Sequence, residues 1–252
     1  MIFARERAEV IANKLKKLMV VRKFQLDDWK VKEGFFLRPE EADRAEEDWE
    51  TFDSRLMHWY GPDRHYWFRT VFTVPEEYDG KGLWLRIRTQ IEEWDDAKNP
   101  QFLVFLNGEV VQGADMNHRE VLLSEAATAG ETVTVDLQAY SGTLHPEFRL
   151  MADVEEVSEP VKDLYYDIQV PLWAMDRMDQ EGKTAIDILT VLNDTISLLD
   201  LRDVFSDDFY RSVEEARAYI AKALYEDLAG DDTVIATCIG HCLLYTSPSP
   251  RD

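Results

Sequence analysis

The sequence is poor in cysteine and has no long apolar run. Its 252 residues include two cysteines, Cys238 and Cys242, which is too few for a disulfide framework and indicates a reducing compartment. No stretch approaches the roughly 20 apolar residues that span a bilayer. The N-terminal residues 1–21 also lack the continuous apolar segment of a secretory signal peptide. We therefore expect a cytoplasmic protein without a membrane partner.

Positive charge is also scarce. The chain has 28 Lys and Arg against 50 Asp and Glu, which gives a formal net charge of −22 at pH 7. Nucleic-acid binding depends on clustered cations that contact phosphates, so this composition argues against a nucleic-acid partner. With 45% hydrophobic and 12% aromatic residues, the chain is not largely disordered. Its length suffices for a core that needs no disulfide or structural metal.

Residues 1–60 are predicted to form an N-terminal helix and an acidic loop. Within residues 8–21, apolar positions recur at the spacing of one helical face: Ile11, Leu15, Leu18 and Met19. We expect this face to dock on a core, with a membrane-surface helix as the alternative. Residues 34–55 are acidic and show no apolar period, so we expect a solvated loop or a short helix there.

Residues 61–158 are predicted to form an antiparallel β-sandwich of the jelly-roll, galactose-binding-like type. Short aromatic and β-branched runs alternate with turn signals about every ten residues, as in sandwiches and jelly rolls. Asn107-Gly108 separates two apolar runs and is a strong hairpin signal, because both residues tolerate positive φ. The expected strands cover residues 65–74, 83–89, 102–107, 109–111, 120–123, 132–137 and 148–154.

Residues 159–230 are predicted to form a helical linker, which makes the fold class mixed α and β. Apolar residues recur at helical spacing in 164–178 and 184–199. Ser206 is the expected N-cap of a third helix that continues through residue 228 to Gly230. Residues 233–239 then form a continuous apolar run, typical of a buried parallel strand. We expect an α/β domain to begin near residue 232.

Residues 242–252 break this pattern, because a buried strand should lead into a loop and helix rather than a Pro-Ser-Pro sequence. They resemble the translated read-through of a transposase adapter used in sequencing libraries, and we exclude them from the fold. Cys242 is then not a native residue, so the sequence offers no metal or redox pair with Cys238.

The segment Thr-Val-Ile-Ala-Thr-Cys-Ile-Gly-His, residues 233–241, resembles the first barrel strand of glycoside hydrolase family 38 α-mannosidases of the cytosolic and bacterial type. In that family the strand ends in Gly-His-x-His-x-Asp, and the second His and the Asp bind the catalytic zinc. His241 matches only the first His, so the expected ligands are missing here. Further segments resemble the family in the same order along the chain: residues 65–69, 115–123, 164–167, 192–194, 198–201 and 209–213.

This resemblance implies a function for the intact protein. It implies the N-terminal accessory region of a retaining exo-α-mannosidase, which removes terminal α-mannose from oligosaccharides and uses zinc or another divalent metal. Retention uses two carboxyl groups about 5–5.5 Å apart, and the resemblance places these beyond residue 241, in the missing catalytic barrel whose first strand is residues 231–241. We therefore expect no catalytic residue, metal ligand or cofactor in residues 1–241, and a homo-oligomer is a further possibility. The alternative is a free-standing β-sandwich that binds carbohydrate or another subunit.

Two sets of side chains are candidates for contact with sugar. Asn117, His118 and Arg119 lie between two predicted strands, where a loop could touch sugar hydroxyls or a neighbouring subunit; a structural role for His118 is the alternative. His58 and His65 flank the aromatic pairs Trp59-Tyr60 and Tyr66-Trp67. These aromatic rings could pack in the core or stack on sugars.

Overall fold

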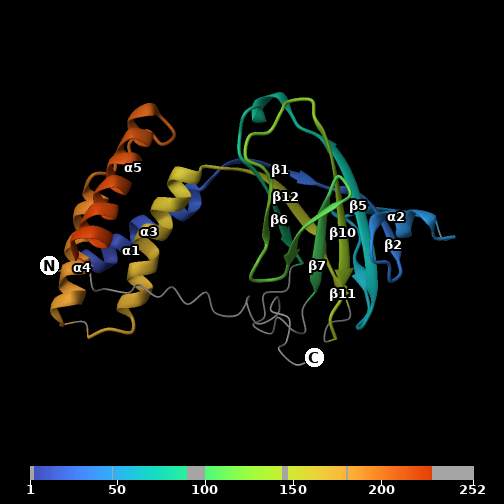
Figure 1. The fold of residues 1–252 in the computed structure, drawn as a ribbon, viewed down its shortest axis with the longest axis horizontal. Coiled ribbons are helices and arrows are strands. Elements are labelled where there is room, and N and C mark those ends of the chain that lie inside the picture. The colour runs from blue at the N-terminus through green and yellow to red at the C-terminus, as the bar shows by residue number, and fades with distance from the viewer. Residues whose placement is uncertain (1–2, 47, 90–99, 144–146, 180, 229–252) are drawn as a thin grey trace. The chain divides into compact units, whose positions relative to one another are not determined.

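The computed structural model describes residues 3–46, 48–89, 100–143, 147–179 and 181–228. The chain divides into two compact units. One unit comprises Lys17–Lys162 and is called the sheet unit. The other combines Met1–Lys16 with Asp163–Asp252 and is called the helical unit. Figure 1 shows the elements of both units.

The sheet unit contains two main antiparallel sheets and a small two-stranded one. The four-stranded sheet has the order β1 (Val20–Leu26), β12 (Met151–Val157), β6 (Leu83–Arg88) and β9 (Glu120–Ser124). The six-stranded sheet has the order β3 (Glu50–Asp53), β2 (Asp28–Glu33), β5 (His65–Thr73), β10 (Thr132–Tyr140), β7 (Gln101–Leu106) and β8 (Glu109–Ala114). The third sheet pairs β4 (Trp59–Tyr60) with β11 (Glu147–Phe148). A 3₁₀ turn at Glu76–Tyr78 follows β5.

One hydrophobic core joins the two main sheets. Leu85 and Val154 of the four-stranded sheet belong to the same buried cluster as Phe68 and Leu137 of the six-stranded sheet. Each of these residues is fully buried. Side chains alternate between the two faces of a strand, so each sheet keeps a second, outer face. The expected mixed fold with antiparallel sheets and later helices is confirmed.

The hairpin predicted at Asn107-Gly108 is confirmed. Strands β7 and β8 pair antiparallel and leave only these two residues between them. Asn107 has a φ of 51° and Gly108 a φ of 89°, the left-handed conformation that Asn and Gly adopt most readily. The local sequence therefore sets the register of this pair.

The structure differs from the prediction in the first 60 residues, which contain strands β1 to β4 as well as the two helices α1 and α2. The sequence Asp28–Glu33 alternates apolar and charged residues, the period of a half-buried strand. Its Trp29 is buried against Phe52 and the rest of the core. The predicted short helix is present as α2 (Pro39–Arg44), but it is not fully solvated, because Ala42 is buried.

Helix α1 (Ala4–Leu18) buries the predicted face only in part, because Leu15 is fully buried while the other three predicted residues are partly exposed. The predicted face combined Ile11, Leu15, Leu18 and Met19. The fully buried side chains of this helix are three alanines and that leucine: Ala4, Ala8, Ala12 and Leu15. Within the helical unit, Arg7 Nη1 of this helix donates to Asn193 Oδ1 at 2.7 Å.

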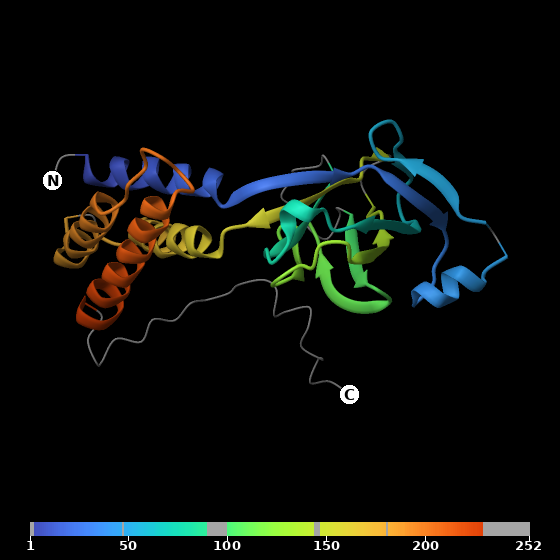
Figure 2. The ribbon, with the colours of Figure 1, turned by 90° about the horizontal axis from the view of Figure 1, so that it is seen from above.

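The remaining helices begin close to their predicted positions. Helix α3 spans Glu159–Met175, α4 spans Lys183–Ser197 and α5 spans Asp207–Ile220, continued by a π-helical segment at Ala221–Leu228. Figure 2 shows α4 and α5 side by side. In each of the two helices the buried side chains recur at helical spacing, and they include Leu192 of α4 and Phe209 of α5.

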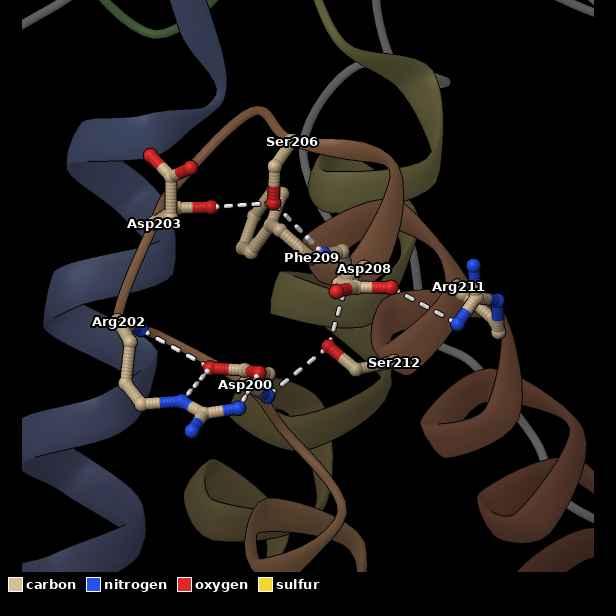
Figure 3. A network of polar contacts seen from close by, with 8 residues as sticks. All are labelled: Asp200, Arg202, Asp203, Ser206, Asp208, Phe209, Arg211 and Ser212. Atoms are coloured by element: carbon tan, nitrogen blue, oxygen red, sulfur yellow. Dashed lines mark hydrogen bonds and ion pairs between the residues drawn. The ribbon is translucent and has the colours of Figure 1, made fainter.

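The connection between α4 and α5 is held by hydrogen bonds of its own side chains (Figure 3). Ser206 Oγ accepts from the backbone N–H of Phe209 at 3.2 Å, so the predicted N-cap is confirmed. Asp200 binds the Arg202 guanidinium through Nε at 2.9 Å, and its own backbone N–H donates to Ser212 Oγ at 2.9 Å. This network fixes the chain direction at the start of α5.

The predicted barrel strand, His241 and residues 242–252 lie outside the described residues. Among the helices that the structure describes, none combines the length and apolarity needed to cross a bilayer.

Candidate functional site

The predicted sugar-contacting residues lie in the loop between β8 and β9. Asp115 organises this loop, because its Oδ1 accepts from the backbone N–H groups of Asn117 and His118, each at 2.8 Å. The same oxygen lies 3.0 Å from His118 Nδ1. The imidazole is thus held beside a carboxylate while its side chain stays 43% exposed.

Arg119 of the same loop is held by one side-chain hydrogen bond and one backbone hydrogen bond. Its Nε donates to the Met116 carbonyl at 2.5 Å, and its own carbonyl accepts from the Ile87 N–H at 2.8 Å. The hollow beside Arg119 has a volume of about 10 Å³, close to the minimum for one water molecule. These bonds account for the shape of the loop. Contact of Asn117, His118 or Arg119 with sugar or with a second subunit stays a prediction.

The second candidate region is the outer face of the six-stranded sheet, which residues 34–46 partly cover. We call residues 34–46 the cover segment. Ala42 of this segment packs with Trp67 of β5 and Phe105 of β7 in a small buried cluster. Three partly buried residues pack against that cluster: Phe36, Trp49 and Leu103. The segment predicted to be a solvated loop thus closes one part of the sheet.

Charged side chains are bound beneath this cover. Arg69 Nε lies 2.5 Å from Asp136 Oδ1, and its Nη1 lies 2.6 Å from Asp43 Oδ1. The guanidinium also stacks 4.8 Å from the Trp49 ring centroid. Lys32, itself buried, donates to the Ala42 carbonyl at 2.6 Å.

Burial raises the pKa of Asp136, against the opposing effect of the Arg69 guanidinium. Both carboxylates of this network are bound by the same guanidinium, but the Asp136 side chain is 2% exposed whereas that of Asp43 is 46% exposed. Asp136 is therefore not placed to exchange a proton with a substrate. We interpret the network as one that attaches the cover segment to the sheet.

The cover segment leaves a hollow on the same outer face. Its volume is about 220 Å³, and eight residues line it: Phe35, His65, Gln101, Phe102, Leu103, Gln138, Ala139 and Tyr140. His65 faces this hollow, whereas Tyr66 and Trp67 of the same strand are buried. The core reading of the early aromatic pairs holds for Trp59, Tyr66 and Trp67, which are buried, whereas Tyr60 is exposed. Stacking on sugar stays a prediction.

In the part of the chain that the structure describes, no group of three or more His, Cys, Asp or Glu side chains is placed to hold a metal ion. The zinc of the resembled family needs the second His and the Asp of its strand motif, and this sequence has neither after His241. The described residues do not fit that metal, so we derive no metal-dependent step for them.

Comparison with known proteins gives a distant structural similarity. No family model and no curated protein matches the chain. Among solved structures, the chain is similar to the β-glucuronidase of Ruminococcus gnavus in complex with N1-substituted uronic isofagomine, at 15% identity and a TM-score of 0.37. The crystal structure titled for that enzyme alone gives 16% identity and a TM-score of 0.36.

These alignments cover part of each protein. They include 55% of this chain and, for the isofagomine complex, 30% of that chain; the D-glucaro-d-lactam complex gives the same coverages at 16% identity and a TM-score of 0.36. The chain thus matches about 30% of the enzyme's length. The similarity is to part of a glycoside hydrolase and identifies no family.

Most residues that line the hollow were not predicted from the sequence. The expected strand over residues 132–137 ended before Gln138 and Tyr140, although β10 extends through both. Alternation continues to the end of this strand, with Asp136, Gln138 and Tyr140 on one face. Continuing that period would have placed these side chains together. Phe35 reaches the hollow only through the path of the cover segment, which no local pattern specified.

Proposed function

We propose that this chain is the N-terminal accessory region of a retaining exo-α-mannosidase acting on terminal α-mannose of oligosaccharides. The observation that carries the proposal is the order of its parts: an antiparallel β-sandwich followed by a set of helices. This order agrees with the sequence segments that resemble family 38 α-mannosidases. In the proposal, the sandwich is of the jelly-roll type and the catalytic barrel follows the helices.

The proposed chemistry belongs to the barrel rather than to the described residues. Two carboxyl groups would act there as nucleophile and as acid/base, and a divalent metal would orient the sugar hydroxyls. The described residues would support that barrel, and a homo-oligomer would form through the sandwich. The loop Asn117–Arg119 would contact sugar hydroxyls or a neighbouring subunit in the assembled enzyme.

The gene that encodes the chain provides the first test. We expect the reading frame to continue after His241 with any residue, then His, any residue and Asp, and then a barrel-length sequence. A frame that encodes residues 242–252 followed by a stop codon would contradict the proposal and favour a free-standing binding module.

A substitution in the loop tests whether the loop contacts the sugar substrate. His118→Ala in the protein expressed from the complete gene should lower kcat/KM for an aryl α-mannoside. His58→Ala is the control for loss of a hydrogen-bonded histidine outside the loop, because His58 Nε2 accepts from Arg149 Nε at 3.1 Å within the sheet unit. Unchanged kinetics of His118→Ala would remove the loop from the proposal.

A further inference from the structure

The hollow on the outer face of the six-stranded sheet has an aromatic floor. The His65 and Tyr140 side chains lie opposite one another on β5 and β10. Their ring centroids are 5.1 Å apart and their planes are tilted by 32°. Phe35 stands edge-on to His65, with centroids 4.8 Å apart and an interplanar angle of 70°. The three rings therefore form two sides of an open corner.

Polar side chains border this corner in strand register. Gln101 on β7 lies opposite Tyr140. Gln138 lies two residues before Tyr140 on β10, and so on the same face of that strand. Tyr140 Oη donates to Asp63 Oδ1 at 3.1 Å, which fixes the phenol ring. Gln138 Nε2 donates to the Phe36 carbonyl, so its amide orientation is set as well. Amide, phenol and carboxylate oxygens remain able to accept further hydrogen bonds.

The aromatic residues of the corner are exposed in spite of their apolar rings. Phe35 is 64% exposed, and the rings of His65 and Tyr140 are partly exposed beside it. Ligand sites combine such aromatic surface with a few oriented polar groups. Groups already held in one geometry lose little entropy when a ligand binds.

The size and charge of the hollow narrow the class of ligand. A volume of about 220 Å³ is smaller than the roughly 300–1,000 Å³ typical of sites for drug-sized molecules. It suits one ring. A chain with a formal charge of −22 repels anions, and the carboxylate of Asp63 is bonded to Tyr140, which lines the hollow. A neutral ring with an apolar face and hydroxyls at its edge fits both constraints.

We propose that the corner formed by Phe35, His65 and Tyr140 binds a single neutral pyranose ring. One face of the sugar ring packs its C–H groups on the aromatic floor. The hydroxyls at its edge bond to the side-chain oxygens of Gln138, Tyr140 and Asp63. This binding site goes beyond the proposed enzymatic function and does not depend on it, because it needs no catalytic group.

Saturation-transfer NMR on the chain of residues 1–252 tests this site, with methyl α-D-mannopyranoside, methyl β-D-glucopyranoside and methyl β-D-galactopyranoside as probes. We expect transfer from the protein to ring C–H protons of at least one of them. Phe35→Ala should weaken that binding about tenfold, which corresponds to about 1.4 kcal/mol. Tyr140→Ala should do the same, and Tyr140→Phe should retain the stacking signal.

Phe3→Ala is the matched control, because Phe3 is 67% exposed and lies in the helical unit outside the hollow. It should bind the sugar as the parent chain does. Circular dichroism melts of each variant establish that it folds. Absence of transfer to all three glycosides, or equal binding by the folded Phe35→Ala and Tyr140→Ala variants, would overturn the proposal. Tighter binding of methyl β-D-glucuronide than of the neutral glycosides would overturn the ligand class. None of these outcomes measures hydrolysis, so they leave the enzymatic proposal to its own test.

Discussion

Arg69 and Asp136 face one another across strands β5 and β10, and the Arg69 Nε lies 2.5 Å from the Asp136 Oδ1. The carboxylate is almost fully buried and the guanidinium partly so. The same guanidinium holds Asp43 of the cover segment. This one cation therefore connects the outer face of a central strand to the segment that shapes the sugar-sized hollow.

Removing that cation should destabilise the sheet unit. Arg69→Met leaves the Asp136 carboxylate buried without its partner, and we expect the free energy of unfolding to fall by about 3 kcal/mol. Adding Asp136→Asn should recover part of the loss. Urea denaturation followed by tryptophan fluorescence measures both. Arg64→Met is the control: the Arg64–Glu33 pair is half exposed at 2.9 Å, so its loss should cost much less stability than the loss of Arg69.

The same variant should respond to pH. Burial raises the pKa of Asp136, and loss of Arg69 raises this pKa further. A carboxyl whose pKa is higher in the folded state than in the unfolded state destabilises the fold when ionised. The loss of unfolding free energy in Arg69→Met should therefore shrink as the pH falls from neutral toward the pKa near 4 that an Asp side chain has in the unfolded chain. A deficit that stays constant over this range would contradict the assignment.

Asp200 should contribute the opposite pH dependence to the helical unit. The Arg202 guanidinium, through its hydrogen bonds, lowers the pKa of Asp200 to about 2. A lowered pKa stabilises the fold above the unfolded pKa, and the contribution is lost as the pH falls through the folded pKa of about 2. The melting temperature should therefore fall less steeply in acid for Asp200→Asn and for Arg202→Ala than for the parent chain. Equal acid slopes in all three would remove this role.

Ser206 should contribute to the free energy of unfolding only through its hydroxyl group, which caps helix α5. It caps α5 by accepting from the Phe209 N–H at 3.2 Å, so Ser206→Ala should lower the free energy of unfolding by about 1 kcal/mol. Ser206→Asp keeps an acceptor and adds a negative charge at the helix N-terminus, and it should retain the stability of the parent chain. Thermal melts by circular dichroism compare them. A loss of equal size in both variants would show that the cap is not the cause.

Gly108 and Gly113 provide a paired test within one strand pair. Gly108 has a φ of 89°, whereas Gly113 has no positive φ and a Cβ there would lie 3.9 Å from the Phe102 carbonyl oxygen. Gly108→Ala should destabilise the chain by about 1 kcal/mol through backbone strain. Gly113→Ala should have a smaller effect. Urea denaturation gives both values, and the reverse order would contradict the hairpin geometry.

The sequence predicted elements whose signals are local. The Asn107-Gly108 turn and the Ser206 cap depend on neighbouring residues, and both are confirmed. The buried face of α1 depends on what packs against it, and Ala4, Ala8 and Ala12 gave no hydrophobic contrast to detect. The cover segment joins an apolar run at residues 35–37 to a mixed-charge run at residues 38–46 and has no apolar period, so the packing of its Ala42 with Trp67 could not be read from its own residues.

The candidate sites also differ in how far the sequence predicted them. Asn117, His118 and Arg119 were predicted as a loop and lie in one. The hollow brings together Phe35, His65, Gln101 and Tyr140 from distant parts of the sequence. Strand register creates that proximity, and register was specified by the sequence at only one hairpin. Family resemblance, rather than local pattern, supplied the proposed enzymatic function.

Hydrolysis by the complete gene product tests the central proposal most directly. The protein expressed from the full reading frame should release the aryl group from an aryl α-mannoside, and NMR of the first-formed sugar should show the α-anomer. Residues 1–252 alone should release none. Absence of activity in the complete protein, or hydrolysis by residues 1–252 alone, would contradict the account.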